Sequence, residues 1–181
     1  MCRPEASRRP DARRRSHDRA WPLGSALLGI AMVAVHDSAG PMVVYNVTAS
    51  APLGWYLVRP PAELIRGDLV LARTPDSARD LAEHRGYLPA NVPLVKRVTA
   101  LPPDRVCAEG SAIVLNGRVV AKQLMTDSRG RALPRWAGCS ALAPDDVFLL
   151  MEDVPDSFDS RYFGPVKEGS ILGRLVPLWT W

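Results

Sequence analysis

The fold class of this chain is decided by Ile113-Val114-Leu115-Asn116-Gly117-Arg118-Val119-Val120. Two runs of β-favouring residues flank an Asn-Gly pair, which is typical of the two-residue turn of a β-hairpin. Both central positions of that turn need a positive φ, which Asn and Gly adopt readily. The stretch therefore predicts two antiparallel strands joined by a tight turn.

Short strands are expected on both sides of this hairpin. The chain of 181 residues contains 17 prolines and 13 glycines, which suit short strands joined by turns. One short helix is expected over Ser77–Arg85, capped by Asp76 or Ser77 and ended by Gly86. The fold class is therefore mainly β, an antiparallel β domain with one short helix. The further expected strands are Gly54–Val58, Asp68–Ala72, Leu94–Leu101, Val147–Met151 and Ile171–Leu178.

The excess positive charge lies in a tail at the N-terminus. The net charge is +4, and residues 1–20 hold seven arginines against three acidic residues, so the remaining chain is neutral. A basic tail without a basic groove argues against nucleic acid as a partner.

An uncharged apolar stretch, Trp21–Val35, follows this tail. It would reach only about 22 Å as a helix, short of a hydrocarbon core of about 30 Å, but continuing to Ala39 gives enough length. We expect a basic cytoplasmic tail (1–20), a single transmembrane helix (21–39) and a domain outside the inner membrane, in the periplasm (40–181). A cleaved signal peptide is the alternative, although Asp37 spoils the cleavage site that would end at Ala39.

The cysteines agree with export. Cys107 and Cys139 fall in the part expected outside, where disulfides form. One disulfide is possible there, and two unpaired buried thiols are the alternative. None of the three histidines is spaced with a second ligand, so a metal is not expected. No other cofactor is expected either.

Familiar catalytic patterns do not occur in the sequence. His84 is the only histidine beyond the tail and the anchor, and it lies on the charged short helix. The chain has no G-x-S-x-G elbow, no S-x-x-K and no phosphate-binding glycine loop. What remains is a serine paired with a lysine distant in sequence.

Ser50 is the candidate nucleophile. It lies just past the expected anchor, and Pro52 and Gly54 predict a tight bend after it. In an extended segment Thr48 would point to the same side as Ser50. Its hydroxyl is therefore expected where an oxyanion would form.

Lys96 is the candidate base. Strand alternation places Lys96 on the same apolar face as Leu94, Val98 and Ala100. Burial there favours the neutral amine, which a lysine needs in order to take a proton from serine. The alternative is that Ser50 is a turn residue and that Lys96 extends to solvent.

Three separated segments resemble the boxes of type I signal peptidases, family S26, and most closely the conjugative-transfer (TraF-type) branch. They stand in the family's order and the resemblance covers about residues 40–181. Ala100 and Pro103 depart from the glycines usual after the lysine box. The segments are NVTASAPLGWY at Asn46–Tyr56, GDLV at Gly67–Val70 with KRVTALP at Lys96–Pro102, and PDSFDSRYFGP at Pro155–Pro165.

The resemblance implies a role for each matching residue. Ser50 would attack the scissile carbonyl, and Lys96 would take its proton and later protonate the leaving amine. Thr48 and the backbone N–H of Ser50 would stabilise the oxyanion.

The third segment would supply supporting residues. Ser157 would hydrogen-bond Lys96 and orient it, and Asp159 and Arg161 would form a supporting ion pair. The family's fold is largely β, with an apolar surface near the site that meets the membrane, and its substrates bind as an added strand. A small insert follows Lys96, and a Cys107–Cys139 disulfide would staple it.

The resemblance also implies partners. The expected substrate is an exported precursor, the pilin precursor (prepilin) of a conjugative transfer apparatus, whose other components are further partners. An acyl-enzyme on Ser50 would be resolved by water or, with cyclisation of the pilin, by an amine. The alternatives are a general type I signal peptidase and a non-catalytic periplasmic adaptor of a conjugation apparatus.

Overall fold

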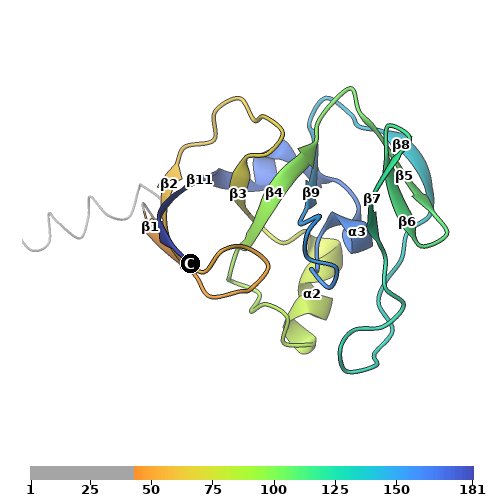
Figure 1. The fold of residues 1–181 in the computed structure, drawn as a ribbon, viewed down its shortest axis with the longest axis horizontal. Coiled ribbons are helices and arrows are strands. Elements are labelled where there is room, and N and C mark those ends of the chain that lie inside the picture. The colour runs from red at the N-terminus through yellow and green to blue at the C-terminus, as the bar shows by residue number, and fades with distance from the viewer. Residues whose placement is uncertain (1–42) are drawn as a thin grey trace, which may run out of the picture. The chain divides into compact units, whose positions relative to one another are not determined.

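The computed structural model describes residues 43–181 of the chain. These residues form two antiparallel β-sheets (Figure 1). The tail predicted for residues 1–20 and the anchor predicted for 21–39 lie outside these described residues. Within residues 43–181 no helix has both the length and the apolar character needed to cross a bilayer.

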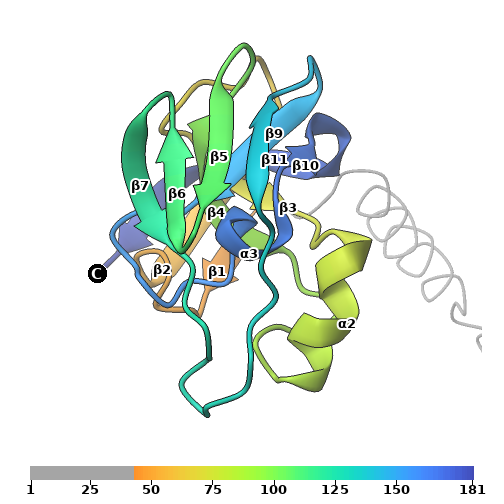
Figure 2. The same cartoon turned by 90° about the vertical axis from the view of Figure 1, so that its right-hand side faces the viewer.

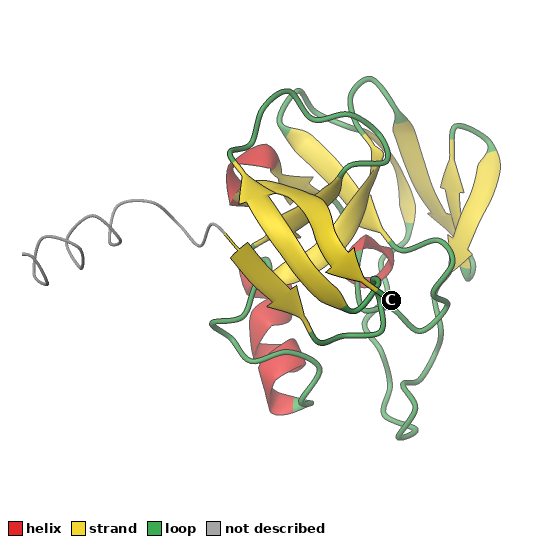
Figure 3. Ribbon diagram, turned by 60° about the vertical axis from the view of Figure 1, so that its left-hand side comes forward, coloured by secondary structure: helices red, strands yellow, loops and turns green. Residues whose placement is uncertain are grey.

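The larger sheet has seven strands in the order β1-β2-β11-β3-β4-β9-β10. The long strand β11 pairs with β2 on one side and with β3 on the other, so the end of the chain joins the two halves of this sheet (Figure 3). The strands are β1 (Val43–Asn46), β2 (Gly54–Arg59), β3 (Leu69–Ala72), β4 (Leu94–Ala100), β9 (Asp146–Leu150), β10 (Val166–Lys167) and β11 (Ile171–Thr180).

The smaller sheet has four strands in the order β7-β6-β5-β8 (Figure 2). Its central hairpin is the predicted one: Asn116 and Gly117 have φ angles of 49° and 84°, and Leu115 pairs with Arg118. The mainly antiparallel β prediction is thus confirmed. The strands are β5 (Arg105–Glu109), β6 (Ala112–Leu115), β7 (Arg118–Lys122) and β8 (Gly138–Ala141).

The predicted helix is present as α2 (Asp76–His84), but its predicted cap was wrong. Pro75 occupies the N-cap position, and no side chain caps the helix. The Asp76 carboxylate instead lies inside the first turn, 2.6 Å from the Arg79 guanidinium. At the other end Gly86 has a φ of 68°, which stops the helix as predicted.

The expectation of a single helix also needs correction. The described residues contain a second helix, α3 (Ser160–Phe163), and a 3₁₀ turn, η1 (Glu168–Ser170). Both are too short to show a helical repeat in sequence. Strands β1, β5, β8 and β10 were likewise missed, and β8 has no buried residue and therefore no alternation to detect.

The two sheets share one apolar core. Its members from the large sheet include Ala100, Phe148 and Leu150, which pack against residues of β5 and β6 such as Val106 and Ile113. A second cluster, around Val70, Val98 and Leu149, lies under the middle of the large sheet. Strands β4 and β9 contribute residues to both clusters. Strand β4, which carries Lys96, is therefore packed into both parts of the core.

Candidate active site

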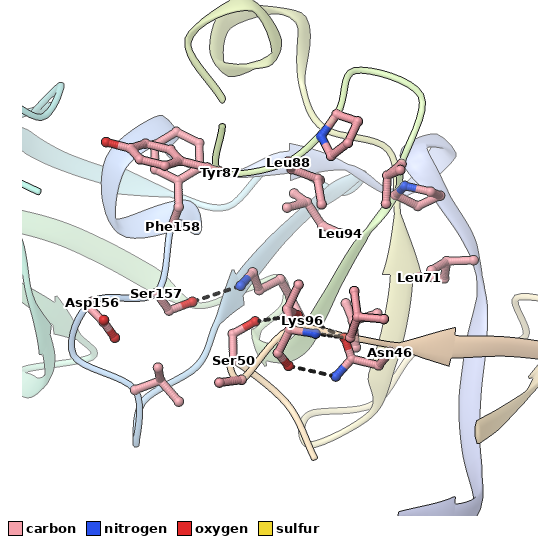
Figure 4. A pocket seen from close by; sticks show the side chains of 18 of the residues that line it. Asn46, Ser50, Leu71, Tyr87, Leu88, Leu94, Lys96, Asp156, Ser157 and Phe158 are labelled. Carbon is pink, nitrogen blue, oxygen red and sulfur yellow. Dashed lines mark hydrogen bonds between the residues drawn. The ribbon is translucent and has the colours of Figure 1, made fainter. Parts of the chain in front are cut away.

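One cleft collects most of the residues that the sequence singled out. It has a volume of about 810 Å³, and Thr48, Ser50, Lys96 and Ser157 all line it (Figure 4). Its walls come from the end of β1 and the following turn, the first half of β4, and three segments, 87–93, 124–133 and 154–158. The cleft thus joins segments that are more than 100 residues apart in sequence.

Lys96 lies in the middle of β4 on its buried face. Only 4% of its surface is exposed, whereas the neighbouring Arg97 is exposed. The Lys96 Nζ donates a hydrogen bond of 2.8 Å to Ser157 Oγ. Burial lowers the pKa of Lys96 to about 8, with a further lowering by Arg161 and a partial offset from the carboxylates of Asp159 and Asp156.

Ser50 lies in a turn after β1, and this corrects the extended segment expected there. Its Oγ is nevertheless 3.3 Å from Thr48 Oγ1, so the two hydroxyls meet as expected, although for a different reason. The turn reverses the direction of the chain, and this reversal brings the two hydroxyls together. In an extended strand, alternation would instead have placed them on the same face.

Asn46, for which the sequence predicted no role, organises this turn. Only 4% of its surface is exposed. Its Nδ2 donates to three backbone oxygens of the turn, those of Thr48 (2.9 Å), Ala51 (3.0 Å) and Pro52 (3.1 Å). Its Oδ1 accepts from the Thr48 backbone N–H at 3.1 Å. An asparagine four residues before a candidate nucleophile is the signal that could have found it, because this side chain readily satisfies turn backbone.

The same asparagine settles which hydroxyl donates between Thr48 and Ser50. Because Nδ2 faces three carbonyl oxygens, Oδ1 must be the atom that faces Thr48, and the Thr48 hydroxyl donates to it at 2.8 Å. Thr48 Oγ1 therefore accepts the hydrogen bond from Ser50 Oγ. For Thr48 to donate to an oxyanion, its proton would have to leave Asn46.

Ser157 is placed by a loop that a buried ion pair anchors. The Arg161 guanidinium donates to both Asp159 carboxylate oxygens, at 2.8 and 3.0 Å, and both residues are almost fully buried. It also donates to the carbonyls of Met151 and Pro155, each at 2.8 Å. Asp159 and Arg161 thus hold both ends of the loop that precedes Ser157, and neither lines the cleft.

Cys107 and Cys139 lie outside the cleft and are joined by a disulfide in the structure. They are directly paired residues of β5 and β8, so the bond links a buried strand to an exposed edge strand. With Glu109 they form the one group of potential metal ligands among the described residues. Because the disulfide uses both thiols, this group offers a single carboxylate.

Exposed aromatic residues gather on the outer face of β1, β2 and β11. Tyr45 pairs with Trp55 across the strands, with ring centroids 5.0 Å apart, and Trp181 lies 6.2 Å from Tyr45. Trp179, opposite Trp55 on β11, is 73% exposed. We call these four residues the aromatic face. It begins at the strand that leads into the Ser50 turn.

The antiparallel β fold and the three sequence segments that resemble signal peptidase boxes together indicate one class of protein. The family model described as "Signal peptidase, peptidase S26" matches residues 20–180, and the chain belongs to that family.

Within the family, the relatives come from two groups. The conjugal transfer protein TraF of Agrobacterium fabrum (strain C58 / ATCC 33970) is 37% identical over 145 residues, which cover 75% of this chain and 81% of that protein. The plasmid transfer protein TraF of Escherichia coli is 33% identical over 87% of this chain and 94% of its own length. Signal peptidase I of Bacillus caldolyticus is 33% identical over a shorter match, 45% of this chain and 50% of that protein. The chain is thus related to TraF over most of its length.

Proposed function

We propose that this protein is a serine endopeptidase with a Ser50/Lys96 dyad that removes the leader peptide from an exported precursor. The observation that carries the proposal is the buried Lys96, held by Ser157 in the cleft that also contains Ser50. A lysine with a pKa of about 8 is neutral in a useful fraction of molecules near neutral pH.

In the proposed mechanism Ser50, Lys96 and Thr48 each have one role in peptide cleavage. Neutral Lys96 takes the proton of Ser50 while Ser50 Oγ bonds to the carbonyl carbon of the peptide. The resulting oxyanion is stabilised by the backbone N–H of Ser50 and by the Thr48 hydroxyl, whose proton turns from Asn46 Oδ1 to the oxyanion. The peptide C–N bond then breaks, the amine leaves with the proton from Lys96, and the leader remains as an ester on Ser50. Attack by water releases the leader and restores the serine.

The substrate that we propose is the prepilin of a conjugative transfer apparatus. The length of the match to conjugal and plasmid transfer proteins TraF supports this choice. Other components of the apparatus are the expected further partners. Cyclisation needs a second cut, near the C-terminus of the pilin, that leaves the pilin itself as an ester on Ser50. Attack on this second ester by the amine at the pilin N-terminus, instead of by water, gives a cyclic pilin.

We further propose that the domain works at the periplasmic surface of the inner membrane. The apolar stretch 21–39 would anchor it, and the Cys107–Cys139 disulfide suits an oxidising compartment. The aromatic face supports this placement, because exposed Trp and Tyr side chains suit the interface between water and lipid.

Two alternatives make different predictions. A general type I signal peptidase would use the same dyad on many precursors, and the match to signal peptidase I of Bacillus caldolyticus favours it. Complementation of a strain depleted of its general signal peptidase separates the two. An adaptor of the apparatus would keep the fold without needing Ser50.

The deciding experiment compares the detergent-purified full chain with its Ser50→Ala variant on prepilin, with mass spectrometry as the readout. We expect the wild type to remove the leader and the variant to leave it intact. A product with free ends indicates hydrolysis, and a product lighter by one water indicates cyclisation. Equal cleavage by both forms would exclude Ser50 as nucleophile, and inactivity of both on prepilin and on a general precursor would favour the adaptor.

A further inference from the structure

A long arm from the small sheet reaches one wall of the cleft. Residues 124–133, here called the arm, follow β7 and hang below the small sheet, towards α2 (Figure 2). Their backbone folds on itself: Leu133 N donates to Met125 O, and Asp127 N donates to Arg131 O, both at 2.9 Å. The arm is therefore a formed element that its own backbone hydrogen bonds hold together.

Polar contacts tie the arm to the segment that follows α2. The Asp127 carboxylate accepts from the Tyr87 hydroxyl and, at 2.7 Å, from Arg131 Nε. The Arg131 guanidinium lies 5.4 Å from the centre of the Tyr87 ring, and Arg85 donates to the Ala132 carbonyl at 2.7 Å. We call the contacts among Arg85, Tyr87, Asp127 and Arg131 the clasp.

The clasp is built to persist across the physiological pH range. Burial alone would raise the pKa of Asp127, but the hydrogen bonds from Tyr87 and Arg131 and from the backbone N–H of Arg129 outweigh it. The pKa of this carboxyl is therefore held well below its usual range. Asp127 stays ionised and keeps its partners wherever the dyad can work.

The clasp places apolar side chains in the cleft. Leu124 and Leu133 of the arm line the cleft together with Leu88 and Phe158 from the opposite segments. Leu124 remains 37% exposed, so an apolar ligand could still remove surface from water. The ring centre of Phe158 lies 5.2 Å from that of Tyr87 (Figure 4). Because Phe158 directly follows Ser157, this contact connects the clasp to the residue that hydrogen-bonds Lys96.

We propose that the arm, held by the clasp, forms an apolar subsite in which Leu124 and Leu133 contact one apolar side chain of the leader peptide. The inference rests on the proposed function, because it takes the ligand of the cleft to be the peptide that Ser50 cuts. The arm belongs to the same cleft as the dyad, so the contacted side chain and the cut bond belong to one bound peptide. The arm then selects which leader is cut.

A binding experiment tests this without requiring cleavage. The full chain carrying Ser50→Ala is titrated with fluorescent prepilin leader peptides in detergent, and the dissociation constants are obtained from anisotropy. The peptides are the natural leader and a set in which each apolar residue in turn is replaced by serine. Leu133→Ala is then added to the protein. Arg129→Ala is the control, because this exposed arm residue has no side-chain hydrogen bond or ion pair within the described part of the chain.

We expect Leu133→Ala to weaken binding of the natural leader about tenfold, and Arg129→Ala to leave it unchanged. For one substituted peptide, Leu133→Ala should cause no further loss, because the contact is already absent. An equal effect of Leu133→Ala on every peptide would overturn the subsite.

A second variant guards against a general loss of folding. Tyr87→Phe removes one hydroxyl of the clasp and keeps the ring against Phe158. We expect it to reduce the difference in affinity between the natural leader and the substituted peptide that lacks the contacted side chain. If Tyr87→Phe leaves this difference in affinity unchanged, the clasp does not hold the subsite.

The two proposals fail separately. A wild type that binds leaders with the expected coupling but does not cut them would refute the peptidase and leave the subsite standing. If the wild type cuts prepilin but Leu133→Ala weakens binding of all leader peptides equally, the subsite alone is refuted. Failure of every leader peptide to bind, together with prepilin that stays uncut, would overturn both.

Discussion

At the scale of single residues, the chemistry depends on the protonation of Lys96. With a pKa of about 8, roughly one tenth of the lysine is neutral at pH 7 and about half at pH 8. Because only the neutral amine can accept the proton of Ser50, kcat/KM should rise about tenfold from pH 7 to pH 9 and then level off. Initial rates on a leader peptide across this range check the prediction.

Lys96→Arg is the control for this titration. A guanidinium keeps its charge throughout the range, so this variant should be inactive at every pH tested. A wild-type profile that falls between pH 7 and pH 9 would mean that the charged form of Lys96 is the active one.

Asn46 should matter although it touches no reacting atom. Asn46→Ala removes a donor shared by three carbonyl oxygens and the acceptor for the Thr48 hydroxyl. We expect a loss of about 1–3 kcal/mol in the free energy of unfolding, because buried turn groups lose their partners. We also expect kcat to fall at least about tenfold with a smaller change in KM, since Thr48 and Ser50 lose their fixed positions.

Thermal unfolding and steady-state rates of Asn46→Ala check the two parts of this prediction. Asn91→Ala is a suitable control, because Asn91 is exposed and no hydrogen bond of its side chain occurs among the described residues. An unchanged kcat in Asn46→Ala would show that the turn holds its shape without this side chain.

At the scale of elements, the close approach of β2 to β11 depends on Gly54. This residue has a φ of 134°, and a Cβ placed on it would lie 2.1 Å from the Trp179 carbonyl oxygen. Gly54→Ala should therefore push the two strands apart and lower the melting temperature strongly. The site should suffer too, because Gly54 pairs with Asn46 of β1.

Gly67→Ala is the matched control for this substitution. Gly67 also has a positive φ, 95°, but no atom lies within 4 Å of the added Cβ. The alanine there bears the conformational cost alone, of the order of 1 kcal/mol. Equal melting temperatures of the two variants would mean that strand approach at Gly54 is not limiting.

At the scale of the whole molecule, the Asp159–Arg161 pair connects the core to the site. Arg161 is 1% exposed and Asp159 is 0% exposed, and Gln123 of the segment after β7 donates to the Arg161 carbonyl at 2.7 Å. Arg161→Met leaves a buried carboxylate without its partner, which costs about 3–5 kcal/mol. Urea unfolding should show this loss, and cleavage should fall because the loop that presents Ser157 loses its anchor.

Lys167→Ala provides the contrast. Its ion pairs with Asp145 and Asp146 are solvent-exposed, so its removal should change stability little. If Arg161→Met were as harmless as Lys167→Ala, the buried pair would not be what holds the loop.

Local patterns were enough to predict much of this protein. The Asn116–Gly117 turn, the strand around Lys96 and the end of α2 at Gly86 each depend on residues adjacent in sequence. The segments that resemble signal peptidases are likewise short runs of adjacent residues, Asn46–Tyr56, Gly67–Val70, Lys96–Pro102 and Pro155–Pro165. Such features are encoded by side-chain alternation and by the φ angles that Asn and Gly allow, so they can be derived without knowing the fold.

The tertiary structure alone decided how these pieces meet. The bond between Lys96 and Ser157 joins residues 61 positions apart, and the clasp joins Tyr87 to Asp127 across 40. The central role of Asn46 depends on a turn, where strand alternation had predicted an extended segment. Contacts of this kind come from sheet pairing and from the packing of two sheets on one core, and no local pattern records them. The sequence by itself therefore determined the fold class and the candidate dyad, whereas burial, proton positions and the shape of the cleft required the folded chain.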